Sequence, residues 1–275
     1  MNTIIQRKHW NEVVFSLEVK APHVAMNAKP GQFVIVIIEE DGERVPLTIA
    51  GINPEQETIT LVIQAVGYST KKLAQFNVGD NIPHILGPLG EPAPLEGYKK
   101  VLVVGGGVGI APLYPQAKYL KENGATIYSV LGGRSEEYII FREAFEEISD
   151  EYAYATNDGS LGVEGFVTDV IEKELAKDSS YDLVIAIGPL VMMKAVCEVT
   201  RRYNIKTNVS LNPIMVDGTG MCGGCRVTVG DQTRFACVHG PDFDGHLVDF
   251  DEAIMRQGIY KKEENHHCRL EGITE

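Results

Sequence analysis

The stretch VLVVGGGVGIAP, residues 101–112, decides the fold of the middle of the chain. An apolar run that ends in glycines and continues into a helical pattern is typical of a buried strand turning directly into a helix. Glycines at such a turn let backbone N–H groups approach a pyrophosphate, and Pro112 can begin the helix because its missing N–H would be unpaired there. The strict pattern GxGxxG is not met, since Pro112 takes the third glycine's place. The pattern alone leaves two interpretations of these glycines open: a nucleotide-binding turn, or a tight strand-to-helix connection with no ligand.

Strands and helices alternate on the C-terminal side of this turn. Expected strands cover residues 101–107, 126–133, 151–156 and 182–188, and expected helices cover 113–124, 167–175 and 191–203. This alternation predicts an α/β domain with a parallel sheet covered on both faces.

The first hundred residues have a different pattern, in which short apolar runs are separated by turns. Expected strands cover residues 13–19, 32–39, 58–66 and 81–86. Short strands at this spacing predict an antiparallel β-barrel or sandwich. We therefore expect three domains, at residues 1–97, 98–208 and 209–275, the last Gly-rich and without an obvious core of its own.

Composition and charge narrow the classes of function. The chain has 275 residues, 44% of them hydrophobic, and a formal net charge of −13, which argues against a nucleic-acid partner because phosphate binding needs clustered Lys and Arg. No apolar run approaches the roughly 20 residues that cross a bilayer, and the N-terminus has no uninterrupted apolar core typical of a signal peptide. We expect a cytoplasmic protein with no membrane contact.

Three of the five cysteines, Cys222, Cys225 and Cys237, lie within sixteen residues, which favours a metal centre over disulfides. Counted from Asp217, the spacing is D-x4-C-x2-C-x11-C, whereas plant-type 2Fe-2S sites begin C-x4-C-x2-C. Glycines between these positions would let backbone N–H groups face inorganic sulfur. The following residues predict a hairpin that turns at Gly230 and returns Cys237 to the loop.

The spacing alone leaves the fourth ligand open. Cys197 lies in an apolar helical pattern, where a cysteine is more often a small buried hydrophobe, and Cys268 lies in the polar tail beside His266 and His267. A zinc site made of the three loop cysteines and His239 is a further alternative, although zinc sites usually repeat the CxxC pair. That alternative would make the chain a zinc-stabilised nucleotide-binding regulator without redox activity.

The α/β part resembles the pyridine-nucleotide domain of the ferredoxin reductase family. The resemblance rests on GVGIAP, GGRS (132–135), NDGSLG (157–162) and GPLVMM (188–193), all expected at the carboxyl ends of strands, where open α/β sheets bind ligands. It implies NAD(H) contacts at Gly107, Gly109, Arg134, Asp158, Gly188 and Pro189. Many relatives carry Cys where this chain has Ile187, which puts a cysteine role there in doubt. We expect a branched side chain at Gly109 to block the pyrophosphate and leave the fold intact. The choice of NAD(H) rests on the resemblance, because Arg134 and Ser135 could equally contact a 2′-phosphate.

The resemblance extends to the first domain, which it implies is an FAD-binding barrel. RVPLTIAG (44–51) is similar to the family's flavin signature, and VGYSTKKLA (66–74) places hydroxyls at the start of a short helix. The implied FAD contacts are Arg44, Pro46, Leu47, Thr48, Gly67, Ser69 and Thr70. Arginine suits a diphosphate because its planar fork donates paired hydrogen bonds. Hydride transfer between nicotinamide and flavin requires no side-chain acid or base, so no catalytic residue is expected.

Over nearly its whole length the chain is similar to the small subunits of NADH-dependent ferredoxin:NADP oxidoreductases. The match is closest in MVDGTGMCGGCRVTV (215–229) and FACVHGPDFDGHLVDFDEA (235–253). It implies that Asp217 is the fourth ligand, with Cys222, Cys225 and Cys237, of a 2Fe-2S cluster. It further implies a larger partner subunit with flavin and 4Fe-4S clusters, a heterodimer that handles ferredoxin and NADP and can bifurcate electrons. The alternative is the electron-transfer subunit of NAD-dependent dihydroorotate dehydrogenase, which carries Cys at the position of Asp217.

Overall fold

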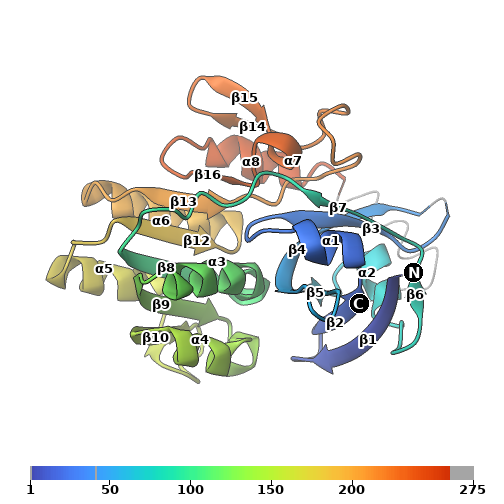
Figure 1. Ribbon diagram of the computed structural model, residues 1–275. Coiled ribbons are helices and arrows are strands. Elements are labelled where there is room, and N and C mark those ends of the chain that lie inside the picture. The colour runs from blue at the N-terminus through green and yellow to red at the C-terminus, as the bar shows by residue number, and fades with distance from the viewer. Residues whose placement is uncertain (1, 41, 261–275) are drawn as a thin grey trace.

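The computed structural model describes residues 2–40 and 42–260. It contains two seven-stranded sheets and a separate two-stranded hairpin. The antiparallel sheet is formed by the N-terminal part, the mostly parallel sheet lies beside it, and the C-terminal segment lies across the top of both in the view of Figure 1. This architecture confirms the expected combination of a β domain and an α/β domain.

The N-terminal sheet is antiparallel and has the order β6-β1-β2-β5-β4-β3-β7. Its elements are β1 (Asn2–His9), β2 (Val14–Lys20), α1 (Pro22–Asn27), β3 (Phe33–Ile37), β4 (Arg44–Asn53), β5 (Thr58–Gln64), α2 (Tyr68–Leu73), β6 (Asn81–Ile82) and β7 (His84–Leu89). The strand expected at residues 81–86 is instead two strands separated by Pro83, which has no N–H to donate to a sheet. Strand β1 was not expected, because its sequence mixes charged residues into the apolar ones.

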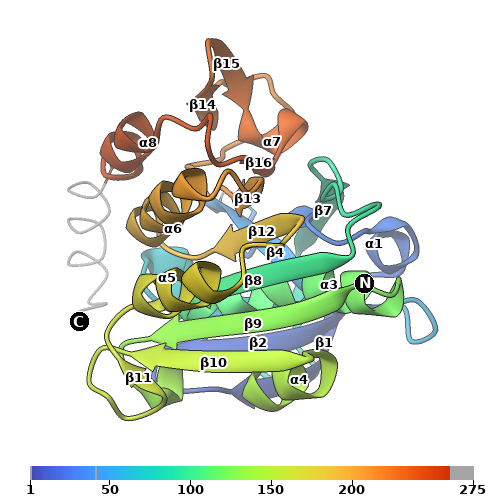
Figure 2. The same cartoon turned by 90° about the vertical axis from the view of Figure 1, so that its left-hand side faces the viewer.

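The α/β sheet has the order β11-β10-β9-β8-β12-β13-β16. Its strands are β8 (Lys100–Gly106), β9 (Thr126–Gly133), β10 (Glu151–Thr156), β11 (Val163–Glu164), β12 (Leu183–Ile187), β13 (Thr207–Ser210) and β16 (Asp242–Asp244), and its helices are α3 (Ile110–Glu122), α4 (Arg142–Ile148), α5 (Val167–Lys177) and α6 (Leu190–Arg202). Helices α3 and α4 cover one face and α5 and α6 cover the other (Figure 2). Alternate residues of β8 enter two different cores, Val101 with α3 and Leu102 with α5 and α6, which is why the strand is apolar throughout.

Within residues 98–208 the paired strands are all parallel, which confirms the expected sheet, and β16 of the C-terminal segment adds one antiparallel pair beside β13. One expectation for this domain needs correction. Helix α3 begins at Ile110 rather than at Pro112, after a 3₁₀ turn, η1 (Gly107–Gly109). Pro112 still lies in the first turn of the helix, where a missing N–H leaves no hydrogen bond unmade.

The C-terminal segment contains β14 (Arg226–Val229), β15 (Gln232–Phe235), α7 (Ala236–His239) and α8 (Phe250–Gln257). The hairpin between β14 and β15 turns at Gly230, whose φ is +60°, which confirms the expected turn. Phe243 and Phe250 belong to the same hydrophobic core as α5 and α6. The segment therefore adds its apolar side chains to the core of the α/β domain.

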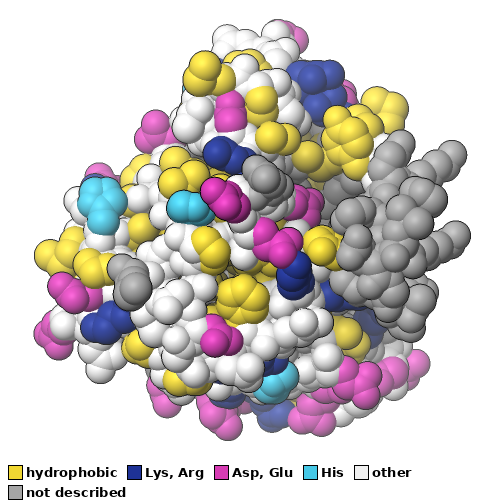
Figure 3. Space-filling model, turned by 90° about the vertical axis from the view of Figure 1, so that its right-hand side faces the viewer, with side chains coloured by type: hydrophobic (Ala, Val, Ile, Leu, Met, Phe, Trp, Pro, Cys, Tyr) yellow, Lys and Arg dark blue, Asp and Glu magenta, His cyan; other side chains and the backbone are white. Residues whose placement is uncertain are grey.

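Within the described residues, no helix is long and apolar enough to span a membrane. On the face shown in Figure 3, Lys and Arg side chains stand singly among acidic and apolar ones and form no continuous basic stripe. Exposed apolar side chains of the C-terminal segment include Met221, which is 88% exposed, and Val216, which is 52% exposed.

Candidate redox site

The glycine turn after β8 serves two different purposes. Gly107 has φ +55°, and the space that its side chain would fill is open within 4 Å. A Cβ on Gly109 would instead lie 2.5 Å from the carbonyl oxygen of Ile187, at the end of β12. Gly107 thus leaves backbone open to a ligand, whereas Gly109 lets the turn before α3 approach the end of β12.

The carboxyl end of β12 lies against the glycine turn that follows β8. A Cβ on Gly188 would lie 3.2 Å from the Cα of Gly106, and Pro189 follows as the N-cap of α6. The structure therefore brings the expected nucleotide residues of both turns together. Met192 covers this contact, since a Cβ on Gly106 would lie 2.3 Å from its sulfur. Met192 belongs to the stretch GPLVMM (188–193), but no individual role was expected of it.

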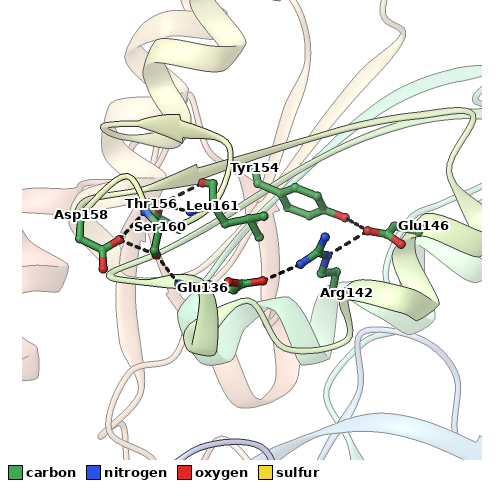
Figure 4. Close-up of polar contacts among 8 residues, drawn as sticks. All are labelled: Glu136, Arg142, Glu146, Tyr154, Thr156, Asp158, Ser160 and Leu161. Carbon is green, nitrogen blue, oxygen red and sulfur yellow. Dashed lines mark hydrogen bonds and ion pairs between the residues drawn. The ribbon is translucent and has the colours of Figure 1, made fainter.

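Arg134 and Asp158 lie on neighbouring loops. Gly133 pairs with Thr156 at the ends of β9 and β10, and the N–H of Asp158 donates to the carbonyl of Arg134 at 3.3 Å. The Asp158 carboxylate accepts hydrogen bonds from the hydroxyl of Ser160 at 2.6 Å and from its N–H at 3.0 Å, and these bonds lower the pKa of Asp158. The Asp158 carboxylate is thus held in the loop that follows the carboxyl end of β10 (Figure 4).

The two expected flavin signatures are adjacent. Glu43, directly before β4, accepts a hydrogen bond at 2.6 Å from the hydroxyl of Ser69 in α2. The Thr70 hydroxyl accepts at 2.9 Å from the N–H of Gly67 and so caps the same helix. The signature residues Arg44, Pro46, Leu47 and Thr48 follow Glu43 along β4. Glu43 was not singled out in the sequence, because its contact depends on the fold.

The curled N-terminal sheet (β1 to β7), a half-barrel that is called the barrel below, touches the cysteine loop. The Arg44 guanidinium donates a hydrogen bond at 3.4 Å to the carbonyl oxygen of Asp217. Gly218 has φ +77°, and a Cβ there would lie 2.9 Å from Leu89 and 3.1 Å from Ile35, on β7 and β3. Only glycine fits between the loop and the barrel at this point.

Two of the expected cluster ligands lie side by side. The sulfur atoms of Cys225 and Cys237 are 3.1 Å apart, and both residues are 1% exposed. Burial raises the pKa of the Cys237 thiol to about 12. Cys222 is exposed, and its sulfur accepts a hydrogen bond at 3.4 Å from the N–H of Gly224.

Asp217 connects to the rest of the loop through its carboxylate. It accepts hydrogen bonds from the N–H groups of Thr219 at 2.8 Å, Met221 at 3.0 Å and Cys222 at 2.8 Å. The Thr219 bond contributes most to lowering the pKa of Asp217. The carboxylate also lies near enough to Cys237 to raise the pKa of its thiol. The printed contacts thus join the expected ligands in two pairs, Cys225 with Cys237 and Asp217 with Cys222.

The donor set suits an iron–sulfur cluster better than a single metal ion. Among residues 2–40 and 42–260, no three His, Cys, Asp or Glu side chains converge on one point that would hold a metal ion. A 2Fe-2S cluster takes two protein ligands on each iron, so its four donors gather in two pairs around the cluster and not on one point. The buried pair Cys225 and Cys237, the loop glycines and the adjacent carboxylate fit such a group.

Two of the other candidates for the fourth ligand, Cys197 and His239, are engaged elsewhere. Cys197 is 3% exposed on α6, and a Cβ on Gly245 would lie 2.4 Å from its sulfur. His239 accepts a hydrogen bond at 3.0 Å on Nδ1 from the N–H of Phe235, whose ring it also stacks on. Cys268, with His266 and His267, lies outside the described residues.

A buried carboxyl marks the point where the barrel, the α/β domain and the C-terminal segment meet. The side chain of Gln116 on α3 donates to Asp242 Oδ2 at 3.2 Å, and a Cβ on Gly31 of the barrel would lie 2.7 Å from the same oxygen. Within the described part of the chain, Oδ1 of Asp242 is buried without a hydrogen-bond partner. Burial raises the pKa of Asp242 to about 7.

This raised pKa predicts a specific pH dependence of stability. Well below pH 4, the ordinary pKa of an aspartate, the carboxyl is protonated in both the folded and the unfolded chain. Between there and about pH 7 the folded chain holds more protons, so the free energy of unfolding falls as pH rises, by on the order of a few kcal/mol. We expect Asp242→Asn to lack this component, which urea unfolding of both proteins at mildly acidic and mildly basic pH measures. Equal pH dependence in the two proteins would contradict the assignment.

Comparison with known proteins identifies the domains. Residues 103–198 match the family described as oxidoreductase NAD-binding domain, and residues 212–249 match the iron–sulfur cluster binding domain of dihydroorotate dehydrogenase B. The expected NAD-binding domain, the iron–sulfur domain and the oxidoreductase class are confirmed. The iron–sulfur match also argues against the zinc alternative.

Similar proteins cover nearly the whole chain. A dihydroorotate dehydrogenase B (NAD(+)) electron transfer subunit homolog from Thermotoga maritima is 47% identical over 96% of this chain and 93% of its own length. The dihydroorotate dehydrogenase B electron transfer subunit of Shouchella clausii is 36% identical over 88% of this chain and 94% of its own.

A solved structure is similar to this chain over nearly the whole length of both. A chain from the structure of an NADH-dependent reduced ferredoxin-NADP oxidoreductase, studied for flavin-based electron bifurcation, is 46% identical, with a TM-score of 0.92 over 96% of this chain and 95% of that one. The ferredoxin reductase-like fold is therefore confirmed. The chain belongs to the family of electron-transfer subunits that includes those of dihydroorotate dehydrogenase B and the similar chain of the ferredoxin-NADP oxidoreductase.

Proposed function

We propose that this chain oxidises NADH, reversibly, through FAD and a 2Fe-2S cluster and passes electrons to a larger flavin and iron–sulfur subunit. The assembly would be an electron-bifurcating, NADH-dependent reduced ferredoxin:NADP oxidoreductase. The observation that carries this proposal is the contact between the expected flavin and cluster sites, where Arg44 reaches Asp217 and Gly218 rests on the barrel. Such contact supports direct electron transfer between the two groups.

The residues of the chain would have distinct tasks. Arg44 would hold the flavin diphosphate, and the open backbone at Gly107 would receive the nucleotide pyrophosphate. Cys222, Cys225, Cys237 and Asp217 would hold the cluster. Bound FAD would supply the conversion of a two-electron hydride into single electrons. The protein contributes orientation and exclusion of water.

One observation favours the ferredoxin:NADP assembly over dihydroorotate oxidation. The cysteine loop has an oxygen donor, Asp217, at the first ligand position of the plant-type spacing. Copurification of the native complex tests this choice. A partner that binds flavin and 4Fe-4S clusters and reacts with NADP(H) supports it, whereas a partner that oxidises dihydroorotate overturns it.

Removing the Arg44 guanidinium should weaken flavin binding. A charge-assisted contact to a diphosphate is worth about 1.5–3 kcal/mol, so we expect Arg44→Ala to lose roughly one to two orders of magnitude in FAD affinity. Flavin fluorescence released on dilution measures the loss. Arg202→Ala is the matched control, because Arg202 lies on α6 with its side chain 60% exposed in an ion pair with Glu172. Equal retention of FAD in both variants would remove Arg44 from the site.

A further inference from the structure

Two arginine side chains bind backbone carbonyl groups between the first two cysteines of the cluster loop. The Arg226 guanidinium donates a hydrogen bond from Nη1 to the carbonyl oxygen of Gly223 at 3.4 Å. The Arg256 guanidinium donates from Nη2 to the carbonyl oxygen of Gly224 at 3.1 Å. The peptide units that follow the two glycines of this turn therefore each have a positive charge beside their oxygen.

The first of these peptide units connects a guanidinium to a ligand sulfur. The carbonyl of Gly223 and the N–H of Gly224 belong to the same peptide unit, and this N–H donates to the sulfur of Cys222 at 3.4 Å. A cation bound to the oxygen polarises the unit and makes its N–H a stronger donor. The carbonyl of Gly224 belongs in the same way to the peptide unit that carries the N–H of Cys225. Each arginine thus acts on a ligand cysteine through one peptide unit.

Arg256 is positioned by α8, a helix of which no role in the site was expected. The N-cap carboxylate of Asp249 accepts a hydrogen bond from the N–H of Glu252 at 2.9 Å, and the helix packs beside β14 (Figure 1). Phe250 and Ala253 anchor α8 because their side chains are buried. Arg256 lies three residues after Ala253, on the same side of the helix, and is half-buried. The anchored helix therefore fixes the direction in which Arg256 reaches the loop.

The charges of these two arginines are not neutralised by carboxylates in the described part of the chain. Arg142 and Arg202 form ion pairs with glutamates, whereas Arg226 and Arg256 form none within residues 2–40 and 42–260. The chain has a formal net charge of −13, which opposes the addition of negative charge to a cluster. Cluster potentials depend on nearby charge and on hydrogen bonds to the sulfurs. The two guanidinium groups supply positive charge where the cluster would gain an electron.

We propose that Arg226 and Arg256 are positioning residues that stabilise the reduced form of the cluster and thereby raise its potential. This inference rests on the proposed function, in which NADH gives two electrons to the flavin and these pass to the cluster one at a time. Each transfer removes one electron from the flavin and adds one negative charge to a group that already has three thiolates and a carboxylate. The partner subunit accepts that electron before the next one arrives.

The test is the midpoint potential of the cluster in Arg226→Gln and Arg256→Gln, measured on the full, cluster-loaded chain. Titration with dithionite and redox mediators, followed by electron paramagnetic resonance, gives this potential. Glutamine keeps a hydrogen-bond donor and removes the charge. We expect each change to shift the equilibrium toward the oxidised cluster by roughly three- to tenfold, which lowers a one-electron potential by about 30–60 mV. Arg256→Lys keeps the charge and should retain most of the original potential.

Arg234→Gln is the matched control. Arg234 is an exposed arginine on β15, in the same hairpin as Arg226, and within the described residues no hydrogen bond joins it to the loop. The variant loses the same charge, so its potential should shift less than those of Arg226→Gln and Arg256→Gln. Equal shifts in all three variants would show that only overall charge matters and would overturn the proposal.

The outcomes separate this inference from the proposed function. Dithionite reduces the cluster without NADH or a partner, so failure of NADH to reduce the flavin overturns the proposed function while the potentials still decide the role of the arginines. Unchanged potentials in both glutamine variants overturn that role and leave the proposed function standing. Loss of the cluster from either glutamine variant would show that its arginine only holds the loop together and would overturn the role of that arginine.

Discussion

The Cys225→Ser variant should purify with its flavin and without an iron–sulfur cluster. Cys225 is 1% exposed and lies 3.1 Å from Cys237, so solvent cannot readily supply a replacement ligand, and a serine hydroxyl is a far poorer donor to iron than a thiolate. Iron content, visible absorption and electron paramagnetic resonance of the reduced protein measure the loss. Cys197→Ser is the matched control, since Cys197 is also a buried cysteine but lies on α6.

Changes at Asp217 refine this prediction. A carboxylate donates less electron density to iron than a thiolate does, so Asp217→Cys should keep the cluster and shift its potential and its resonance signal. Asp217→Ala should make the cluster labile. A signal identical to that of the unaltered chain in Asp217→Cys, or cluster loss specifically in Cys197→Ser, would show that the fourth ligand is wrongly assigned.

Gly109→Val should unfold or strongly destabilise the α/β domain and abolish reduction by NADH. A Cβ at this position would lie 2.5 Å from the carbonyl oxygen of Ile187 and 2.7 Å from the Cα of Gly188, and both are backbone atoms that can move only if β12 shifts. Overpacking of this kind typically lowers the free energy of unfolding by about 1–3 kcal/mol. We expect the branched side chain of valine to cause a loss at the upper end of this range or above it. The expectation that the fold survives this change is therefore wrong.

Gly107→Ala provides the comparison. The space beyond Gly107 is open, so the cost there is only that of placing alanine at φ +55°, about 1–2 kcal/mol. Thermal unfolding of both variants should show the larger loss for Gly109→Val, while NADH reduction should be impaired in both. Greater destabilisation by Gly107→Ala would contradict the packing described for this turn.

Several parts of the fold could be predicted because their signals are local. The apolar run of β8, its glycine turn and the hairpin at Gly230 each depend on a short stretch of sequence. By contrast, β16 is only three residues long and contains two aspartates, so its pairing with β13 depends on contacts made after folding. A period-two or helical pattern cannot show such a strand.

The residues of the candidate site likewise fall into those that the sequence pattern indicates and those that only the fold brings together. The cysteine spacing and the glycine turns were visible in the sequence, because metal ligands and phosphate turns have characteristic spacings. No role was expected of Glu43, Met192 or Asp242, since a glutamate before a strand, a methionine in a helix and an aspartate in a three-residue strand have no distinctive pattern. Their partners Ser69, Gly106 and Gln116 are distant along the chain and are brought near only by the fold.

The most direct test of the central claim is anaerobic titration of the isolated, flavin-loaded chain with NADH, followed by flavin absorbance and by electron paramagnetic resonance of the cluster. We expect the flavin band to bleach and the reduced-cluster signal to develop in the same chain, because the flavin signature and the cysteine loop touch through Arg44 and Asp217. Failure of NADH to bleach fully loaded flavin, or bleaching that never reduces the cluster, would contradict the account.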